Sequence, residues 1–197
     1  MKLNKSIIIT ATIAGLLGLT GCTNQPNKSN TYQCMIDEAS APHWVCDNGS
    51  TMEGGIFAVG SAESSPLGRN FQLTTATAAA RDALARQMNV KVKNMFKNFQ
   101  ASTGIAKEQT ADRAVQNVSK QIANVTLSGS KVMQVWTSPK GIMYVLVGMP
   151  NEIAKQKVKT AVNSSFKNNK ALWQKFLANK ADKKLDEEIA KEFGSEK

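Results

Sequence analysis

One long pattern of apolar residues, spaced at steps of three and four, constrains this chain more than any other feature. Its members are Leu73, Ala76, Ala80, Ala83, Leu84, Met88, Val92, Met95, Phe96 and Phe99. This spacing places them on one face of an α-helix, so we predict a helix from about Asn70 to Gln100, with Asn70 as its N-cap. Residues 76–85 are rich in alanine. We therefore expect this half of the helix to approach its neighbour closely, and we expect that neighbour to be a β-sheet.

Three short segments have the composition of β-strands. Residues 56–62 (IFAVGSA) end in small side chains, which again indicates close backbone packing. Residues 127–137 alternate around two valines and a tryptophan, and residues 138–141 (SPKG) predict a turn. Residues 142–148 (IMYVLVG) are almost unbroken in apolar character, which predicts a central strand covered on both faces.

Further helices are expected on the C-terminal side of the first one. They cover residues 107–125, a segment that opens at Pro150, and residues 170–193. The last of these has too few apolar residues for a core of its own, so it either packs back on the domain or reaches a partner. The predicted fold class is α+β, a single domain with helices packed on a small antiparallel sheet.

The N-terminus has the organisation of an export signal. Two lysines precede an apolar stretch at residues 7–19, which is too short for a membrane span of about 20 residues and suits a signal peptide. The stretch ends in Leu-Thr-Gly-Cys, which resembles a bacterial lipobox with cleavage before Cys22. We predict a lipoprotein signal peptide over residues 1–21, with S-diacylglycerol and an N-acyl chain on Cys22. The alternative is an ordinary secretory signal with a chance cysteine.

The residues after Cys22 bear on the location of the protein. Thr23 follows the cysteine where an aspartate would retain such proteins elsewhere, so we expect the outer membrane, with the domain facing the periplasm. Residues 24–32 have almost no apolar content, and residues 22–40 are predicted to be a lipid-anchored tether.

The net charge of +10 indicates an anionic binding partner, which must be one that an exported protein can encounter. Loss of Lys2 and Lys5 with the signal peptide leaves 23 basic and 15 acidic side chains, a net charge of +8. An exported protein rarely meets nucleic acid, so we expect none as a partner. An anionic component of the envelope explains the charge better.

The two cysteines beyond Cys22 form an even pair in an oxidising compartment. A disulfide between Cys34 and Cys46 would close a loop of roughly a dozen residues and contribute about 3 kcal/mol. Free thiols are one alternative. A metal site that includes His43 is another, but it offers three ligands at irregular spacing and no evident fourth.

The chain offers little for catalysis. His43 is its one histidine, so a site that needs two imidazoles is excluded. Nucleotide-binding loops of the form GxxxxGK[ST], GxSxG elbows and HExxH motifs do not occur in the sequence. We therefore expect no enzyme activity, no catalytic residue, no metal and no cofactor besides the covalent lipid.

The face of the long predicted helix opposite its apolar stripe is basic. It carries Arg81, Arg86, Lys91, Lys93 and Lys97 against a single acid, Asp82. The candidates for binding a partner or an anion are Arg81, Arg86, Lys91 and Lys97. Their ligand would be lipopolysaccharide phosphate, peptidoglycan carboxylate or an acidic protein surface. The alternative is a solvated amphipathic helix.

The order of these motifs resembles the lipoprotein 20 family of bacterial outer-membrane lipoproteins. The matching pieces are the lipobox at Cys22, Ala41–Val45 (APHWV), Val59–Ala62 (VGSA), the alanine-rich helix at residues 76–85, and Met143–Gly148 (MYVLVG). The resemblance implies a compact α+β domain, here residues 41–166, without known catalytic residues. Residues 167–197 would form a charged C-terminal helical tail outside it.

The family includes the flagellar outer-membrane lipoprotein that builds the basal disk around the motor of polarly flagellated bacteria. The resemblance therefore implies a self-assembling envelope scaffold of the basal-disk type, needed for motility. Its expected partners are the outer membrane, further copies of itself, and flagellar motor ring proteins or peptidoglycan. The alternative function is a binding module that holds peptidoglycan, lipopolysaccharide or an acidic protein.

Overall fold

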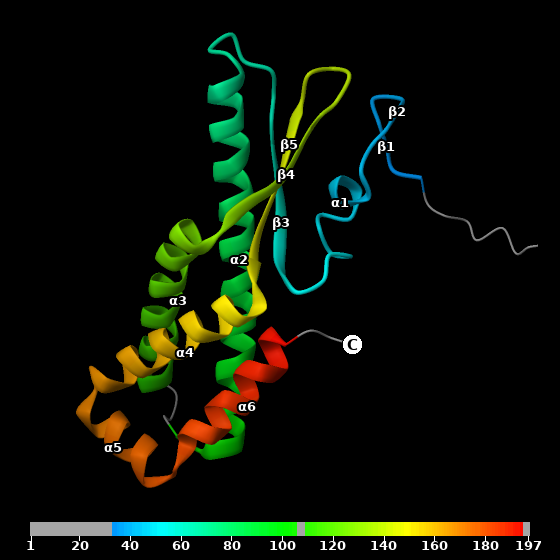
Figure 1. Cartoon of the computed structure of the whole chain (residues 1–197). Coiled ribbons are helices and arrows are strands. Elements are labelled where there is room, and N and C mark those ends of the chain that lie inside the picture. Colours follow the sequence, from blue (N-terminus) through cyan, green and yellow to red (C-terminus); the bar gives the residue numbers. More distant parts are fainter. Residues whose placement is uncertain (1–32, 106–108, 195–197) are drawn as a thin grey trace, which may run out of the picture. The chain divides into compact units, whose positions relative to one another are not determined.

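The structure is a computed structural model and describes residues 33–105 and 109–194 (Figure 1). The predicted signal peptide, the predicted lipid-attachment residue Cys22 and residues 23–32 lie outside the described residues. The elements, in chain order, are β1 (Met35–Ile36), β2 (Ala39–Ser40), α1 (His43–Cys46), β3 (Gly55–Ala62), α2 (Arg69–Thr103), α3 (Gln109–Gly129), β4 (Lys131–Thr137), β5 (Met143–Pro150), α4 (Asn151–Lys167), α5 (Lys170–Ala178) and α6 (Ala181–Phe193). The α+β class is confirmed.

The larger sheet has the strand order β3-β5-β4, and both pairings are antiparallel. The prediction that residues 142–148 form a central strand is confirmed, since β5 lies between the other two. Side chains on both of its faces are buried, including Val145 toward α2 and Leu146 on the opposite face. Further backbone hydrogen bonds to this sheet can therefore form only along the outer edges of β3 and β4.

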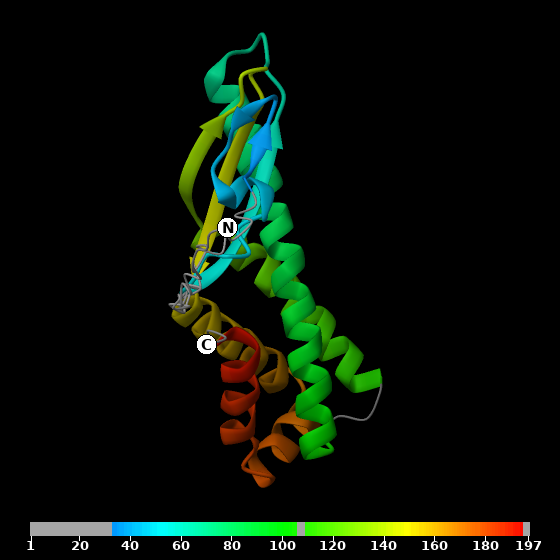
Figure 2. The same ribbon diagram turned by 90° about the vertical axis from the view of Figure 1, so that its right-hand side faces the viewer.

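The first half of α2 lies across one face of the sheet, over β3 and β5 (Figure 2). The backbones of β3 and α2 come close together at Gly60. A Cβ on Gly60 would stand 2.2 Å from the Ala80 nitrogen and 2.4 Å from the Ala76 oxygen. The predicted close approach between the glycine-containing strand and the alanine-rich helix is thus confirmed.

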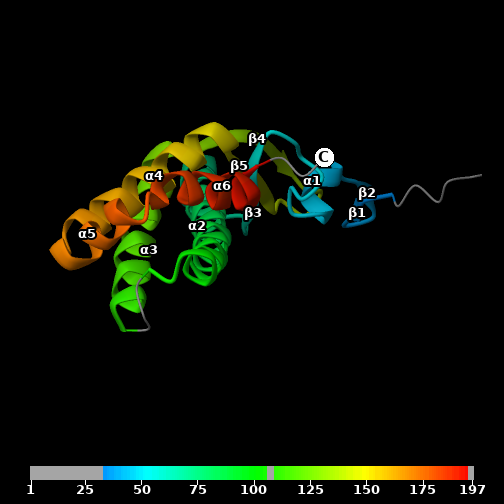
Figure 3. The same cartoon turned by 90° about the horizontal axis from the view of Figure 1, so that it is seen from below.

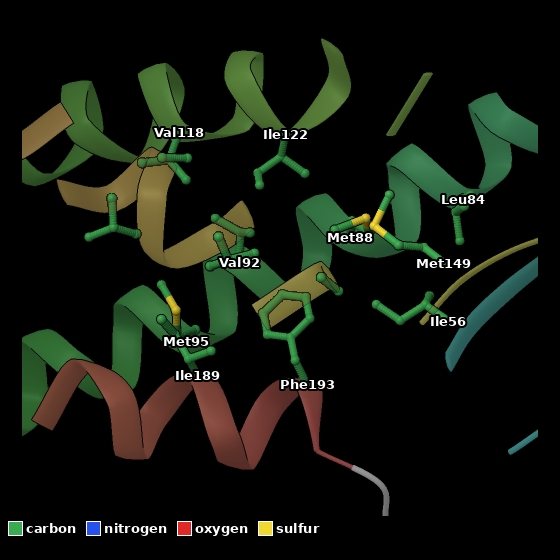
Figure 4. Packing of buried hydrophobic residues seen from close by; sticks show 14 of the residues in the cluster. Ile56, Leu84, Met88, Val92, Met95, Val118, Ile122, Met149, Ile189 and Phe193 are labelled. Atoms are coloured by element: carbon green, nitrogen blue, oxygen red, sulfur yellow. The ribbon is translucent and has the colours of Figure 1, made fainter. Parts of the chain in front are cut away.

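The second half of α2 packs against α3 and α6, and α4 packs on both of these helices (Figure 3). Figure 4 shows Met88, Val92 and Met95 of α2 directed toward side chains of the surrounding helices. Among these are Val118 of α3 and Ile189 of α6, which are buried. The hydrophobic core therefore continues from the sheet into a helical layer.

The C-terminal segment packs back on the domain, which decides between the two alternatives for it. Phe176 of α5 lies 5.3 Å from Phe166 of α4, between ring centroids. Lys159 of α4 forms an ion pair with Asp186 of α6 at 2.6 Å. The segment consists of two helices, because the chain turns at Lys180, whose φ is 47°.

The N-terminal segment lies against the sheet face that α2 leaves open. Trp44 of this segment is buried. A Cβ on Gly49 would stand 3.0 Å from the Leu146 side chain of β5 and 3.0 Å from the Phe57 side chain of β3. The predicted tether, residues 22–40, needs correction at its C-terminal end, because residues 33–40 belong to the folded unit and contain the β1–β2 hairpin.

Two predicted boundaries are wrong. Asn70 is not the N-cap of α2, since Gly68 occupies that position and the helix begins at Arg69. The segment that starts at residue 127 is not strand from its beginning, because α3 continues to Gly129. Thr126 supports this last turn by donating from Oγ1 to the Ile122 carbonyl at 2.8 Å.

Candidate functional site

The predicted disulfide joins Cys34 to Cys46, and it ties the β1–β2 hairpin to α1. Cys34 is buried, and its carbonyl accepts a hydrogen bond from the Ala41 backbone N–H at 2.8 Å. His43 lies exposed at the start of α1. Among residues 33–105 and 109–194, no group of three or more His, Cys, Asp or Glu side chains is placed to hold a metal ion.

Three of the four predicted anion-binding residues on α2 have partners inside the protein. Arg86 pairs with Asp82 one turn away. Arg81 donates from Nε to the Ser130 hydroxyl at 3.2 Å. Arg86 is therefore paired with a carboxylate, whereas Arg81 has a neutral hydroxyl as its partner and keeps its positive charge.

Lys91 contacts the C-terminal end of α6. Its Nζ donates to the Glu192 carbonyl at 2.8 Å and lies 5.9 Å from the centroid of the Phe193 ring. A cation at a helix C-terminus is favoured by the exposed carbonyls of the last turn. Lys91 and Phe193 also line a cavity of about 830 Å³ between residues 49–57, α2 and the end of α6.

Lys97 is exposed and makes no ion pair with any described residue. Together with Lys93 it borders a groove of about 440 Å³ between α2 and α3. Asp112 of α3 lies on the other side of this groove. Lys93 and Lys97 are thus two neighbouring exposed lysines of the predicted basic strip that form no ion pair with any described residue.

The two edges of the sheet differ in how they are covered. At the β3 edge, the Val59 backbone N–H donates to the Asn48 side chain at 3.0 Å, so a residue of the N-terminal segment occupies a hydrogen-bonding position. The outer edge of β4 pairs with no strand in the part of the chain that the structure describes. An unpaired edge presents free backbone N–H and C=O groups to other chains.

The β4 edge also exposes apolar side chains. Val132, Met133 and Val135 are 42%, 52% and 39% exposed, on a strand whose one charged residue is Lys131. Val132 and Val135 face the side of the sheet on which α2 lies, but α2 covers β3 and β5. This apolar edge was not predicted from the sequence, although apolar residues at consecutive positions of a short strand indicate such a site.

No helix in the described residues is both long enough and apolar enough to cross a membrane. A family model described as LPP20 lipoprotein matches residues 42–150, from the start of α1 to the end of β5. A search of the curated proteins finds no match.

Proposed function

The chain belongs to the LPP20 lipoprotein family, and we propose that it is an assembling scaffold of the bacterial outer membrane. Membership of this family makes it a membrane-associated lipoprotein of the cell envelope. We infer that the lipid is carried by Cys22 and that the domain faces the periplasm. The scaffold is of the flagellar basal-disk type, and it is needed for motility. The protein is not an enzyme and needs no cofactor besides the covalent lipid.

The open β4 edge is the observation that supports assembly. Two copies that pair their β4 strands antiparallel, with the two-fold axis between Met133 and Gln134, would place Val132 opposite Val135 on the same face of the sheet. Such apolar cross-strand pairs stabilise a sheet. Lys131 would lie opposite Trp136, so like charges would not meet. The bulge at Met133 in the pairing with β5 increases the local twist of this edge strand.

A β4–β4 pair has two-fold symmetry and closes at two copies. Growth into a ring therefore needs a second contact between dimers. This makes the size of the assembly informative: dimers alone would indicate pairing without ring formation.

The test compares two valine-to-lysine variants of the full-length protein, extracted in mild detergent. Val135→Lys adds a charge to the β4 edge, whereas Val90→Lys adds the same charge at a 58% exposed valine on α2. We expect the unaltered protein and Val90→Lys to form oligomers by light scattering, and Val135→Lys to remain smaller. A monomeric unaltered protein would refute assembly. Equal sizes for the two variants would refute the β4 edge as the contact between copies.

The flagellar role requires a separate experiment in the native host. We expect deletion of the gene to impair swimming and to remove density around the motor in electron cryotomograms. Normal swimming with intact motor rings would refute this role, while the lysine variants would still decide on assembly.

The second candidate function is an envelope-binding module, and the exposed pair Lys93 and Lys97 favours it. Their positive charges beside the groove between α2 and α3 would attract peptidoglycan carboxylates, lipopolysaccharide phosphates or an acidic protein. A binding module predicts retention on isolated peptidoglycan or lipopolysaccharide that weakens with added salt. It also predicts that the protein stays small in the light-scattering experiment.

A further inference from the structure

One end of the domain carries an apolar pair that the proposed assembly does not use. Leu67 is the most exposed large apolar residue of the described chain, at 71%, and Phe71 is 50% exposed. They lie four residues apart, in the β3–α2 connection and the first turn of α2. Contiguous exposed apolar patches mark sites of contact with other surfaces, whereas single exposed apolar residues are common. The position of this pair in the fold therefore matters as well as its exposure.

The backbone around this pair is held in place. The Gly68 N–H donates to the Ser65 carbonyl at 3.0 Å, and the Leu67 N–H donates to the Ser65 hydroxyl at 3.2 Å. The buried Gln72 side chain donates to the carbonyls of Ala62 at 3.1 Å and Gly141 at 2.7 Å. Leu67 and Phe71 are therefore anchored to the ends of β3 and of the β4–β5 turn.

The first described residues of the chain reach the same end of the domain. Ser138 of the β4–β5 turn donates its hydroxyl to the Asp37 carboxylate at 2.5 Å, and Lys140 lies 3.5 Å from the same carboxylate. Asp37 is in the turn of the β1–β2 hairpin. The hairpin, the β4–β5 turn and the β3–α2 connection thus meet, and Figures 1 and 2 both show them at the end opposite α5.

The chain outside the structure limits how far this end can stand from the bilayer. Eleven residues separate Cys22 from Cys34. Even fully extended, this stretch spans at most about 40 Å. Cys34 is buried and bridged to Cys46, so the segment that leads to Cys22 starts from a fixed point of the fold.

We propose that Leu67 and Phe71 insert into the surface of the bilayer that holds the lipid on Cys22. The proposal rests on the lipid anchor of the proposed function, and it adds a second, protein-based contact that sets the orientation of the domain. Transfer of the two side chains out of water supplies the driving force.

The charges around this end are nearly balanced. Arg69 and Lys140 are exposed cations there, whereas Glu38 and Glu63 are exposed anions. Asp37 faces Lys140 and Ser138. The contact should therefore depend on apolar burial and change little with salt, unlike a contact made by Lys93 and Lys97.

The test measures the depth of a nitroxide label in the full-length lipidated protein, reconstituted in vesicles of phosphatidylethanolamine and phosphatidylglycerol. The label is attached to the thiol of Leu67→Cys or of a matched control, Leu177→Cys. Leu177 is a 51% exposed leucine on α5, at the other end of the domain. The bridged Cys34 and Cys46 do not react with the label.

Vesicle flotation first establishes whether the protein is anchored, so that failure of the anchor is separated from failure of this proposal. At position 67 we expect collisions with a water-soluble nickel reagent to fall several-fold, and collisions with oxygen to remain frequent. Position 177 should keep aqueous values for both reagents. The depth at position 67 should be the same in 0.1 M and 1 M salt.

Three results would overturn the proposal for an anchored protein. In the first, the label at position 67 behaves like the label at position 177. In the second, it is shielded from both reagents, which would indicate contact with a second copy or another protein. In the third, it leaves the bilayer at high salt, which would indicate attraction by charge.

Discussion

Replacement of Gly60 by alanine should separate the sheet from its long helix. The added Cβ would lie 2.2 Å from the Ala80 nitrogen, whereas ordinary contact begins at about 3.4 Å. The neighbouring atoms belong to the backbone of α2, so no side chain can rotate to make room. Helix and strand must therefore move apart by the difference, about 1.2 Å.

The loss in the free energy of unfolding follows from the gaps that this movement opens between β3 and α2. Gaps of 0.5–1 Å already forfeit a quarter to a half of the dispersion energy of a contact. The interface buries Ala58, Ala62, Ala76, Ala80 and Leu84 completely or nearly so. Overpacking costs typically 1–3 kcal/mol where side chains can adjust. Because backbone faces backbone here, we expect a loss of about 3–5 kcal/mol in the free energy of unfolding.

Urea unfolding followed by far-UV circular dichroism measures this loss. The control is Ser61→Ala, which changes the next residue of β3, an exposed one, and should alter the free energy of unfolding by less than about 0.5 kcal/mol. A loss below about 1 kcal/mol for Gly60→Ala, with the circular dichroism of the folded state unchanged, would refute the close backbone approach.

Two further predictions concern the N-terminal segment. Replacing Cys34 and Cys46 by serine should destabilise this segment by about 3 kcal/mol, because the disulfide closes a loop of about a dozen residues and lowers the entropy of the unfolded chain. Hydrogen exchange should show lost protection in residues 33–54. An equal loss of protection throughout α2 would contradict a local effect. The Ser138 hydroxyl, and then Lys140, lower the pKa of Asp37 below its ordinary value of 3.8, so the contact stabilises the fold above that value and is lost as the pH falls through the lower folded value. The Ser138 amide resonance should accordingly titrate below about pH 4 and lose this step in Asp37→Asn; a resonance without any acid titration in the unaltered protein would contradict this.

Local patterns in the sequence were sufficient for much of the fold. The spacing from Leu73 to Phe99 predicted α2, because one helical face has a period that no other element shares. The apolar run of β5 predicted its central place, since only a strand covered on both faces can be apolar throughout. The boundaries of the elements were predicted less accurately, because residues such as 127–129 fit either a strand or the last turn of α3.

The candidate site was predicted less completely. The pairing of Cys34 with Cys46 followed from cysteine number and compartment. The basic residues of α2 were found, but their partners were not, because Lys91 meets Glu192 only when α6 folds back across α2. The apolar face of β4 was also missed, since its exposure depends on where α2 lies over the sheet.

Sequence patterns were enough to predict which segments form the main helix and the central strand, which face of the helix is apolar, and which small residues permit close packing. These properties depend on side chains within one or two turns of each other. Three other features depend on the tertiary fold: the C-terminal helices pack on α2, Asn48 occupies the β3 edge, and the outer edge of β4 pairs with no described strand. The tertiary fold also placed Leu67 and Phe71 beside the end where the N-terminal hairpin docks. Such outcomes depend on contacts between segments far apart in the chain, which no local period encodes.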